Sequence, residues 1–187
     1  MQLSKASYYS DFVIYPIVVI GLVGVAGAHA TWMSAFECLS GCIAGAILWT
    51  LLEYGLHRIA LHYMPLFSPM HALHHNAPLD YIGTPTWVSV TVWLGAVLLP
   101  AWVFAGFAVA SGLTAGIMLG YWWYGIVHHM IHHRTDQSSP GYFVQRRAWH
   151  MKHHYSPRRG NFGVTTTLWD HVFGTAIGTP TRAAISS

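Results

Sequence analysis

The fourteen histidines of this chain fall mostly into short groups whose spacing suits metal binding. Residues 71–75 (HALHH) and 150–154 (HMKHH) both read His-x-x-His-His, and residues 128–133 read HHMIHH. Residues three and four apart are neighbours on one face of a helix, so each segment is expected to aim several imidazoles at a common point. Neutral imidazole is the commonest metal ligand among side chains. The pattern therefore predicts a metal centre.

The number of histidines indicates two metals rather than one. A single ion takes about four to six ligands, and ten or more imidazoles are grouped here. A fourth pair, His57 and His62, is five residues apart, and such side chains diverge by about 140° on a regular helix. These two either serve different metals or are separated by a break in the helix.

The composition predicts that these groups are carried by a membrane protein. The chain is 53% hydrophobic and 8% charged, whereas soluble proteins are about 25% charged. Its length of 187 residues indicates a single domain over residues 1–187. The basic residues form no stripe of the kind that binds nucleic acid, so no nucleic-acid partner is expected.

Four membrane-spanning helices are predicted, and the fold class is all-α. The third apolar region lacks charges and histidines over residues 81–127. As one helix it would reach about 70 Å, against a hydrocarbon core of about 30 Å. We therefore place a turn at residues 110–116 (ASGLTAG). The predicted spans are residues 12–30, 37–56, 86–109 and 113–131.

The charges predict the orientation. With four spans, all nine Lys and Arg residues lie on one side of the membrane, which makes that side cytoplasmic. Both termini and a histidine-rich helical cap holding a dinuclear metal site are then cytoplasmic, and His29 alone lies outside, as a structural residue. Residues 1–12 lack the features of a signal peptide and are expected to be retained. Cys38 and Cys42 are predicted to be small buried residues.

Three longer stretches carry a resemblance to a known family. They are WTLLEYGLHRIALH (49–62), HALHHNAPLD (71–80) and NFGVTTTLWDHVFGT (161–175). With the other histidine motifs they resemble the fatty acid hydroxylase / sterol desaturase superfamily, especially its fatty acid 2-hydroxylase branch, over about residues 45–180. The resemblance implies an integral-membrane, non-haem di-iron enzyme that uses O₂ on acyl chains, including those of sphingolipids.

The resemblance also implies a set of metal ligands. His129 is left out of this set, and the roles of His129, His133 and His171 stay open. The implied ligands are His57, His62, His71, His74, His75, His128, His132, His150, His153 and His154.

Other polar residues are candidates to orient those ligands, because a metal-bound imidazole usually donates its second N–H to a carboxylate or carbonyl. Glu53 stands one helical turn before His57 within an apolar run, where a carboxylate is a functional candidate. His133 is a further candidate. Weaker ones are Asp80, Asp136, Asn161 and Asp170, and the alternative for Asp170 is that it caps the turn in LWDHVFGT.

Two further sets keep alternative interpretations. One is aromatic and either lines an acyl pocket or forms an interfacial belt; it comprises Tyr121, Trp122, Trp123 and Tyr124. The other is basic and meets lipid headgroups, an acidic redox protein or only solvent; it comprises Arg146, Arg147, Arg158 and Arg159.

The predicted function is insertion of a hydroxyl group into a fatty acyl chain, at the 2-position of a free fatty acid or a sphingolipid. Two Fe ions are the expected cofactors, Zn is an alternative occupant, and O₂ is the co-substrate. The chain shows no nucleotide-binding glycine motif, so an external electron donor of the ferredoxin or cytochrome b5 type is expected. A sterol or lipid desaturase and a carotenoid hydroxylase are alternatives with the same site. A metal transporter is the non-enzyme alternative, but the third and fourth spans lack acids and histidines until their ends.

Overall fold

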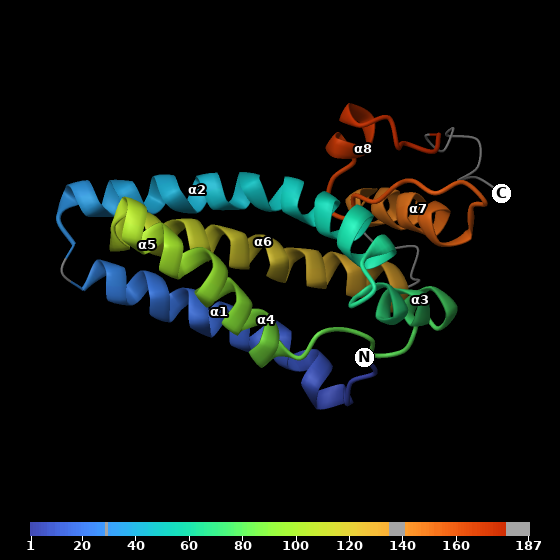
Figure 1. The fold of residues 1–187 in the computed structure, drawn as a ribbon, viewed down its shortest axis with the longest axis horizontal. Coiled ribbons are helices and arrows are strands. Elements are labelled where there is room, and N and C mark those ends of the chain that lie inside the picture. The colour runs from blue at the N-terminus through green and yellow to red at the C-terminus, as the bar shows by residue number, and fades with distance from the viewer. Residues whose placement is uncertain (29, 135–140, 179–187) are drawn as a thin grey trace. The chain divides into compact units, whose positions relative to one another are not determined.

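The computed structural model describes residues 1–28, 30–134 and 141–178, and these are almost entirely helical (Figure 1). Within this part of the chain the one β-bridge, between Gln2 and Ile82, is isolated. The all-α prediction is confirmed. The helices are α1 (Lys5–Gly27), α2 (Trp32–Gly55), the π-helix η1 (Leu56–Leu61), α3 (Ser68–Asn76), α4 (Thr86–Trp93), the π-helix η2 (Leu94–Leu98), α5 (Leu99–Ala105), α6 (Phe107–His133), α7 (Gly141–Tyr155) and α8 (Leu168–Val172).

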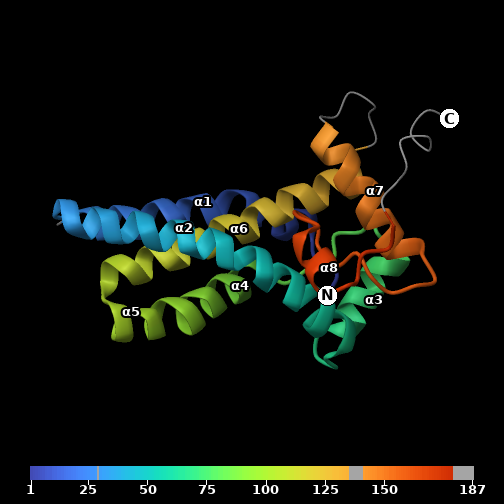
Figure 2. The ribbon, with the colours of Figure 1, turned by 90° about the horizontal axis from the view of Figure 1, so that it is seen from above.

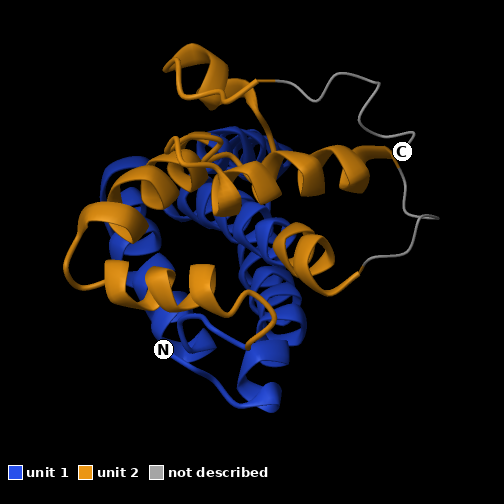
Figure 3. Cartoon of the chain, turned by 90° about the vertical axis from the view of Figure 1, so that its right-hand side faces the viewer, with its two compact units in different colours: residues 1–50, 81–125 blue, residues 51–80, 126–187 orange. Residues whose placement is uncertain are grey.

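The chain forms two compact units, each made of two separate segments (Figure 3). Unit 1 comprises residues 1–50 and 81–125, and unit 2 comprises residues 51–80 and 126–187. The chain passes from one unit to the other within α2 and again within α6. Every histidine except His29, which lies outside the described residues, belongs to unit 2. A single functional domain over the whole chain stays a prediction.

Within the part of the chain that the structure describes, three helical segments are long and apolar enough to cross a membrane: Lys5–Gly27, Trp32–Leu61 and Thr86–Ala105. Large apolar side chains on the first two, such as Ile20 and Phe36, are exposed at 71% and 63%, as expected for surfaces that face lipid. The chain is therefore suited to membrane insertion. The fourth predicted span, residues 113–131, is helical within α6 but is not one of these three segments. Four spans with cytoplasmic termini stay a prediction.

The turn predicted at residues 110–116 is wrong. The chain turns instead at Gly106, whose φ of +82° lies in the region that favours glycine, and residues 110–116 lie inside α6. The glycines there serve helix packing: a Cβ on Gly112 or Gly116 would overlap the backbone of α2 at Cys38 or Cys42. Small residues that let two helices approach closely are typical of membrane helix interfaces.

Unit 1 has its own core. Tyr15, Val19, Ala115 and Met118 form a buried cluster, and Tyr121 packs against it. Two of the four residues in the aromatic set, Tyr121 and Trp122, therefore contribute to this core, whereas Trp123 is 41% exposed. Cys38 and Cys42 are free thiols and only partly buried, because they lie at the α2–α6 contact rather than inside the cluster. The prediction that they are buried is wrong to that extent.

Candidate metal centre

The end of α2 changes its helical period where the first histidine pair begins. Residues 56–61 form a π-helix, in which hydrogen bonds run from residue i to residue i+5, so that side chains five apart lie on one side. His57 and His62 consequently point into the same group of imidazoles. The open question about this pair is settled by a helix that widens rather than breaks.

Ten histidines of unit 2 gather into two groups of five, and the potential ligand atoms within each group lie within 4.8 Å of one another. They come from α2–η1, α3, α6 and α7; Figure 2 shows α3 and α7 together. The structure thus brings together all ten histidines that the resemblance implied. The first group is His57, His62, His71, His75 and His153. The second group is His74, His128, His132, His150 and His154.

Each His-x-x-His-His motif is divided between the two groups. On α3, His71 and His75 enter the first group and His74 enters the second. On α7, His150 and His154 enter the second group and His153 the first. The i, i+4 pair of each motif thus shares one group, as the spacing predicts, while the third ring of the motif enters the other group. Residues four apart diverge by about 40°, whereas adjacent residues diverge by about 100°, so the adjacent ring reaches the other group.

The Nε2 atoms are spaced as metal ligands rather than as hydrogen-bonding partners. His71 Nε2 lies 3.1 Å from that of His57, 3.2 Å from that of His62 and 3.0 Å from that of His75. One ring nitrogen offers a single proton or a single lone pair, so it cannot bond three others. Ligands about 2.1 Å from one cation lie about 3.0 Å apart at right angles and about 3.4 Å apart in a tetrahedron. The observed spacing fits a cation with ligands at right angles.

The second group has the same spacing. His150 Nε2 lies 3.2 Å from that of His128, 3.1 Å from that of His132 and 3.0 Å from that of His154. His74 Nε2 is buried without a hydrogen-bond partner among the described residues. A metal ion would satisfy this buried nitrogen, so the residues present fit a metal in both groups.

In the first group the rings form a square pyramid. His62 is the apex, with its ring centroid 4.5–5.4 Å from the other four. The base has edges of 4.4–4.8 Å, and its diagonal from His71 to His153 is 6.0 Å. Around the base the order is His57, His71, His75 and His153. This arrangement leaves the direction opposite His62 without an imidazole.

In the second group His132 is the apex, 4.7–5.0 Å from the other four rings. The base edges are 4.6–4.9 Å and the diagonal from His74 to His150 is 6.4 Å. Contacts between the two groups involve base rings: His75 stacks on His154 at 4.2 Å, and His57 lies 6.0 Å from His150. The open sides of the two pyramids therefore face each other.

A loop of unit 2 orients two imidazoles of the first group. His57 Nδ1 donates to the carbonyl of Phe162 at 2.6 Å, and His153 Nδ1 donates to that of Gly160 at 2.8 Å. A proton held on Nδ1 leaves the Nε2 lone pair free for a metal. We call residues 160–165 the orienting loop.

Two buried carboxylates hold the orienting loop. Glu53 accepts hydrogen bonds from the backbone N–H groups of Val164 and Thr165, at 2.7 and 2.8 Å, and from the Thr165 hydroxyl. Asp170 accepts from the N–H groups of Phe162 and Gly163, at 2.9 and 2.8 Å. Glu53 and Asp170 therefore bind the loop backbone, and the loop backbone in turn binds His57 and His153. The prediction was a direct hydrogen bond from a metal ligand to one of these carboxylates.

The loop restricts the residue type at two positions, by backbone conformation at Asn161 and by close contact at Gly163. Asn161 has φ +55°, a left-handed conformation that Asn tolerates better than most residues. Its side chain donates to the carbonyl of Trp149 at 3.2 Å and accepts from Ile177 N–H at 2.7 Å. At Gly163 a Cβ would overlap the carbonyl oxygen of Thr166. The sequence signal for this loop was the pair Asn161 and Gly163 in NFGV. Sequence reasoning placed Asn161 only among the weaker candidates.

The other three histidines that the structure describes, His129, His133 and His171, lie outside both groups. His129 and His133 stack on each other at 4.5 Å, on α6. His171 Nδ1 donates to the carbonyl of Thr167 at 2.8 Å, and its ring lies 5.6 Å from Trp149. A role for His133 in orienting a ligand stays a prediction. Asp136 lies outside the described residues.

Burial and the neighbouring imidazoles keep the grouped histidines neutral. Burial, and then the neighbouring histidines, lowers the pKa of His74 and of His132 to about 3. Burial likewise lowers the pKa of His153 to about 3, and burial, His75 and Arg159 lower that of His62 to about 4. Neutral imidazoles keep their lone pairs at pH 7, so no proton has to leave before a metal binds.

Fold and site together define a helical protein with apolar, membrane-length segments and a ten-histidine centre suited to two metal ions. The family comparison agrees: the model for the fatty acid hydroxylase family matches residues 42–175. The chain belongs to the fatty acid hydroxylase family.

Individual relatives support the 2-hydroxylase branch. Fatty acid 2-hydroxylase of Rattus norvegicus is 35% identical over 147 residues, which cover 72% of this chain and 39% of the relative. Ceramide very long chain fatty acid hydroxylase SCS7 of Saccharomyces cerevisiae is 32% identical over 194 residues, covering 94% of this chain and 47% of the relative. The chain thus spans less than half the length of these two relatives.

A solved structure has the same fold. Full-length Scs7p, of which only the hydroxylase domain is visible, superposes with a TM-score of 0.76 at 28% sequence identity. The match covers 94% of this chain and 68% of the solved one.

Proposed function

We propose that this protein hydroxylates carbon 2 of a fatty acyl chain, in a free fatty acid or in a ceramide-type lipid. The observation that carries the proposal is the pair of five-histidine pyramids whose open sides face each other. The named activities of the relatives, fatty acid 2-hydroxylase and ceramide fatty acid hydroxylase, supply the substrate class. The balanced reaction is lipid C–H + O₂ + 2 e⁻ + 2 H⁺, giving lipid C–OH and H₂O.

The ten grouped histidines are proposed to hold two iron ions. Bound iron supplies the redox chemistry with O₂ that an unactivated C–H bond requires. The right-angle spacing of the Nε2 atoms favours iron over zinc, since zinc prefers a tetrahedron of four ligands. Zinc remains an alternative occupant of the same nitrogens, and metal analysis of protein purified without added metal distinguishes the two.

The chain's own residues bind, orient and exclude water. The orienting loop fixes the Nδ1 protons of His57 and His153, while Glu53 and Asp170 fix the loop. His57 and His150 are at most 2% exposed, and such burial keeps solvent away from the reacting carbon. The metal site is proposed to face the cytoplasm, where an external electron carrier of the ferredoxin or cytochrome b5 type meets it.

Product analysis tests this function. The protein is expressed in cells that lack 2-hydroxylated acyl chains, and total fatty acids are analysed by mass spectrometry. We expect 2-hydroxy acids with the wild type and none with His74→Ala. His129→Ala is the matched control, because His129 is a histidine outside both groups, and it should behave as the wild type. A double bond or a hydroxylated carotenoid in place of the 2-hydroxyl would overturn the proposal in favour of a desaturase or carotenoid hydroxylase, and metal uptake without a lipid product would favour a transporter.

A further inference from the structure

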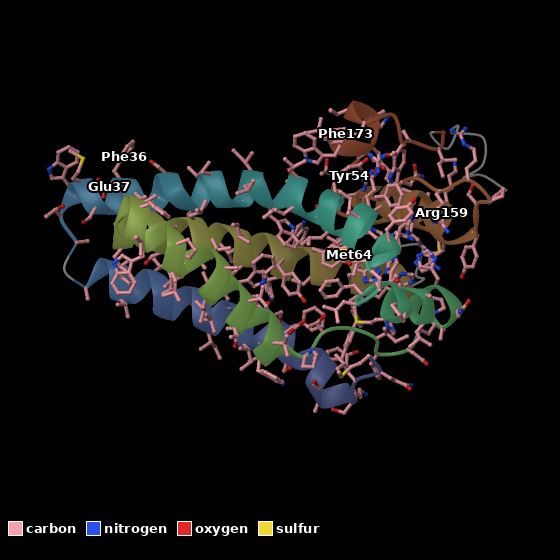
Figure 4. The ribbon with its side chains drawn as sticks, in the orientation of Figure 1. Phe36, Glu37, Tyr54, Met64, Arg159 and Phe173 are labelled. Atoms are coloured by element: carbon pink, nitrogen blue, oxygen red, sulfur yellow. The ribbon has the colours of Figure 1, made fainter. Side chains whose placement is uncertain are left out.

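A cavity of unit 2 reaches the first histidine group from the surface. Its volume is about 550 Å³, within the range of sites that bind other molecules. His62, His71, His75 and His153 contribute to its wall, and Arg158 and Arg159 contribute to its lining at exposed positions. The cavity thus touches four of the five members of the first group. Figure 4 labels Arg159, which lies beside these nitrogen-rich side chains.

The described surface of unit 2 is strongly basic. Its three described acids are Glu53, Asp80 and Asp170, and two of them, Glu53 and Asp170, are buried and hold the orienting loop. Among the described residues of unit 2, Asp80 is the only exposed acid. The described basic residues of unit 2 are Arg58, Arg134, Arg146, Arg147, Lys152, Arg158 and Arg159.

Most of the other basic side chains already make internal contacts. Arg58 donates to the Tyr54 hydroxyl at 2.7 Å, and Arg147 donates to the carbonyls of Ile131 and Arg134. Lys152 donates to the carbonyl of Gly178 at 2.9 Å. These contacts stabilise the unit.

The two cavity arginines are placed differently. Both are exposed, and the guanidinium of Arg159 lies 5.5 Å from the centre of the Tyr63 ring, a cation–π arrangement that leaves its N–H edge available. Arginine in such a position is well suited to a carboxylate partner.

We propose that the rim formed by Arg158 and Arg159 is the docking surface for a small acidic electron-carrier protein, which delivers electrons through the first histidine group. The proposal rests on the proposed function. Per turnover, two reduced one-electron carriers, lipid C–H, O₂ and two protons give two oxidised carriers, lipid C–OH and water.

The geometry favours a carrier over the lipid substrate at this surface. The cavity meets the sides of imidazoles, including the stacked pair His75 and His154, whereas the open sides of both pyramids face each other. Electrons can pass through a ligand ring, but an acyl carbon must reach the open side. A basic rim also steers an acidic protein and raises its association rate.

Charge reversal at the rim tests the docking surface. Arg158→Glu, Arg159→Glu and the double variant are assayed in detergent with reduced ferredoxin, and separately with reduced cytochrome b5, while carrier concentration and salt are varied. At low salt we expect kcat/KM for the carrier to fall about tenfold or more in the double variant. It should approach the wild-type value at high salt. Arg158→Lys and Arg159→Lys should keep most of the rate, and Lys5→Glu, an exposed charge reversal in unit 1, should have no effect.

A single-turnover reaction separates the docking proposal from the function. Protein reduced chemically with dithionite and then given O₂ should form equal amounts of 2-hydroxy lipid in the wild type and in the double variant. No product from the wild type under any reductant would overturn the proposed function. Equal carrier kinetics in both proteins would overturn the docking proposal alone. A loss of rate that appears equally with dithionite, or only when anionic vesicles are present, would assign the arginines to the lipid instead.

Discussion

The two histidine groups have the same number of rings and the same pyramidal arrangement, but they are supported differently. In the first group, two Nδ1 atoms donate to backbone carbonyls of the orienting loop. In the second group, the Nδ1 atoms of His150 and His154 are buried and have no hydrogen-bond partner among the described residues. An acceptor for the second N–H typically changes metal affinity by about 10–100-fold. Equal ligand counts therefore do not imply equal sites, and we expect the first group to bind its metal more tightly.

Replacing the apical histidine of either group is expected to have the largest effect, and it tests whether the two groups bind their metals independently. We expect His62→Ala and His132→Ala each to lower 2-hydroxy product by more than about 100-fold, because each removes a ligand that touches four others. Elemental analysis should find mainly the second metal retained in His62→Ala and mainly the first in His132→Ala. If either variant loses both metals, the groups do not bind independently.

The orienting loop should affect one group only. Asp170→Asn replaces one carboxylate oxygen with an amide N–H₂, so one of the two loop N–H donors, that of Phe162 or of Gly163, loses its acceptor. We expect metal affinity of the first group to fall about 10–100-fold while that of the second is unchanged. Competition with a metal chelator measures both affinities. Asp80→Asn is the control, since Asp80 is an exposed acid in the same unit, and equal weakening of the two groups would show that the loop has no selective role.

Graded metal removal compares the groups directly in the unmodified protein. During titration with a chelator we expect one metal to leave at a concentration about tenfold or more below the other. The metal that remains should be the one lost in His62→Ala. Simultaneous release of both metals would mean that the unpartnered Nδ1 atoms of His150 and His154 do not weaken the second group.

Acid should destabilise the metal-free protein through both groups. In the unfolded chain histidine has a pKa near 6.5, whereas burial lowers the pKa of His74, His132 and His153 to about 3 in the folded chain. Between about pH 6.5 and 3 the unfolded state binds more protons, so stability falls as the pH is lowered through this window. Thermal unfolding in detergent from pH 7.5 to 4.5 measures the effect, and a midpoint that rises on acidification would contradict it.

The smallest expected effect is that of a histidine outside the groups. His129→Ala should change product formation by less than about twofold, because His129 stacks on His133 and belongs to neither group. A large loss of metal from this variant would show that the stacked pair His129 and His133 supports the second group.

Sequence reasoning went furthest where the determining interactions are local. The helical class follows from composition and from the length of the apolar runs, and the resemblance that implied the ten grouped histidines rests on motifs that span only a few residues. It failed at residues 110–116, where glycines were taken for a turn although they face α2. A local reading cannot tell a glycine that bends the chain from one that admits a neighbouring helix, because that neighbour lies about 70 residues away in the sequence.

The sequence by itself determined that imidazoles four residues apart would act in pairs, since the α-helical period fixes that relation within one turn. It also determined that these side chains are imidazoles, which bind metals in their neutral form, whereas burial in the folded chain keeps them neutral. Only the tertiary structure decided which pairs share a group, that η1 turns His57 and His62 the same way, and that Glu53 and Asp170 act through the orienting loop. These depend on contacts between segments up to about 110 residues apart, and no local spacing encodes the direction from which a distant backbone carbonyl approaches.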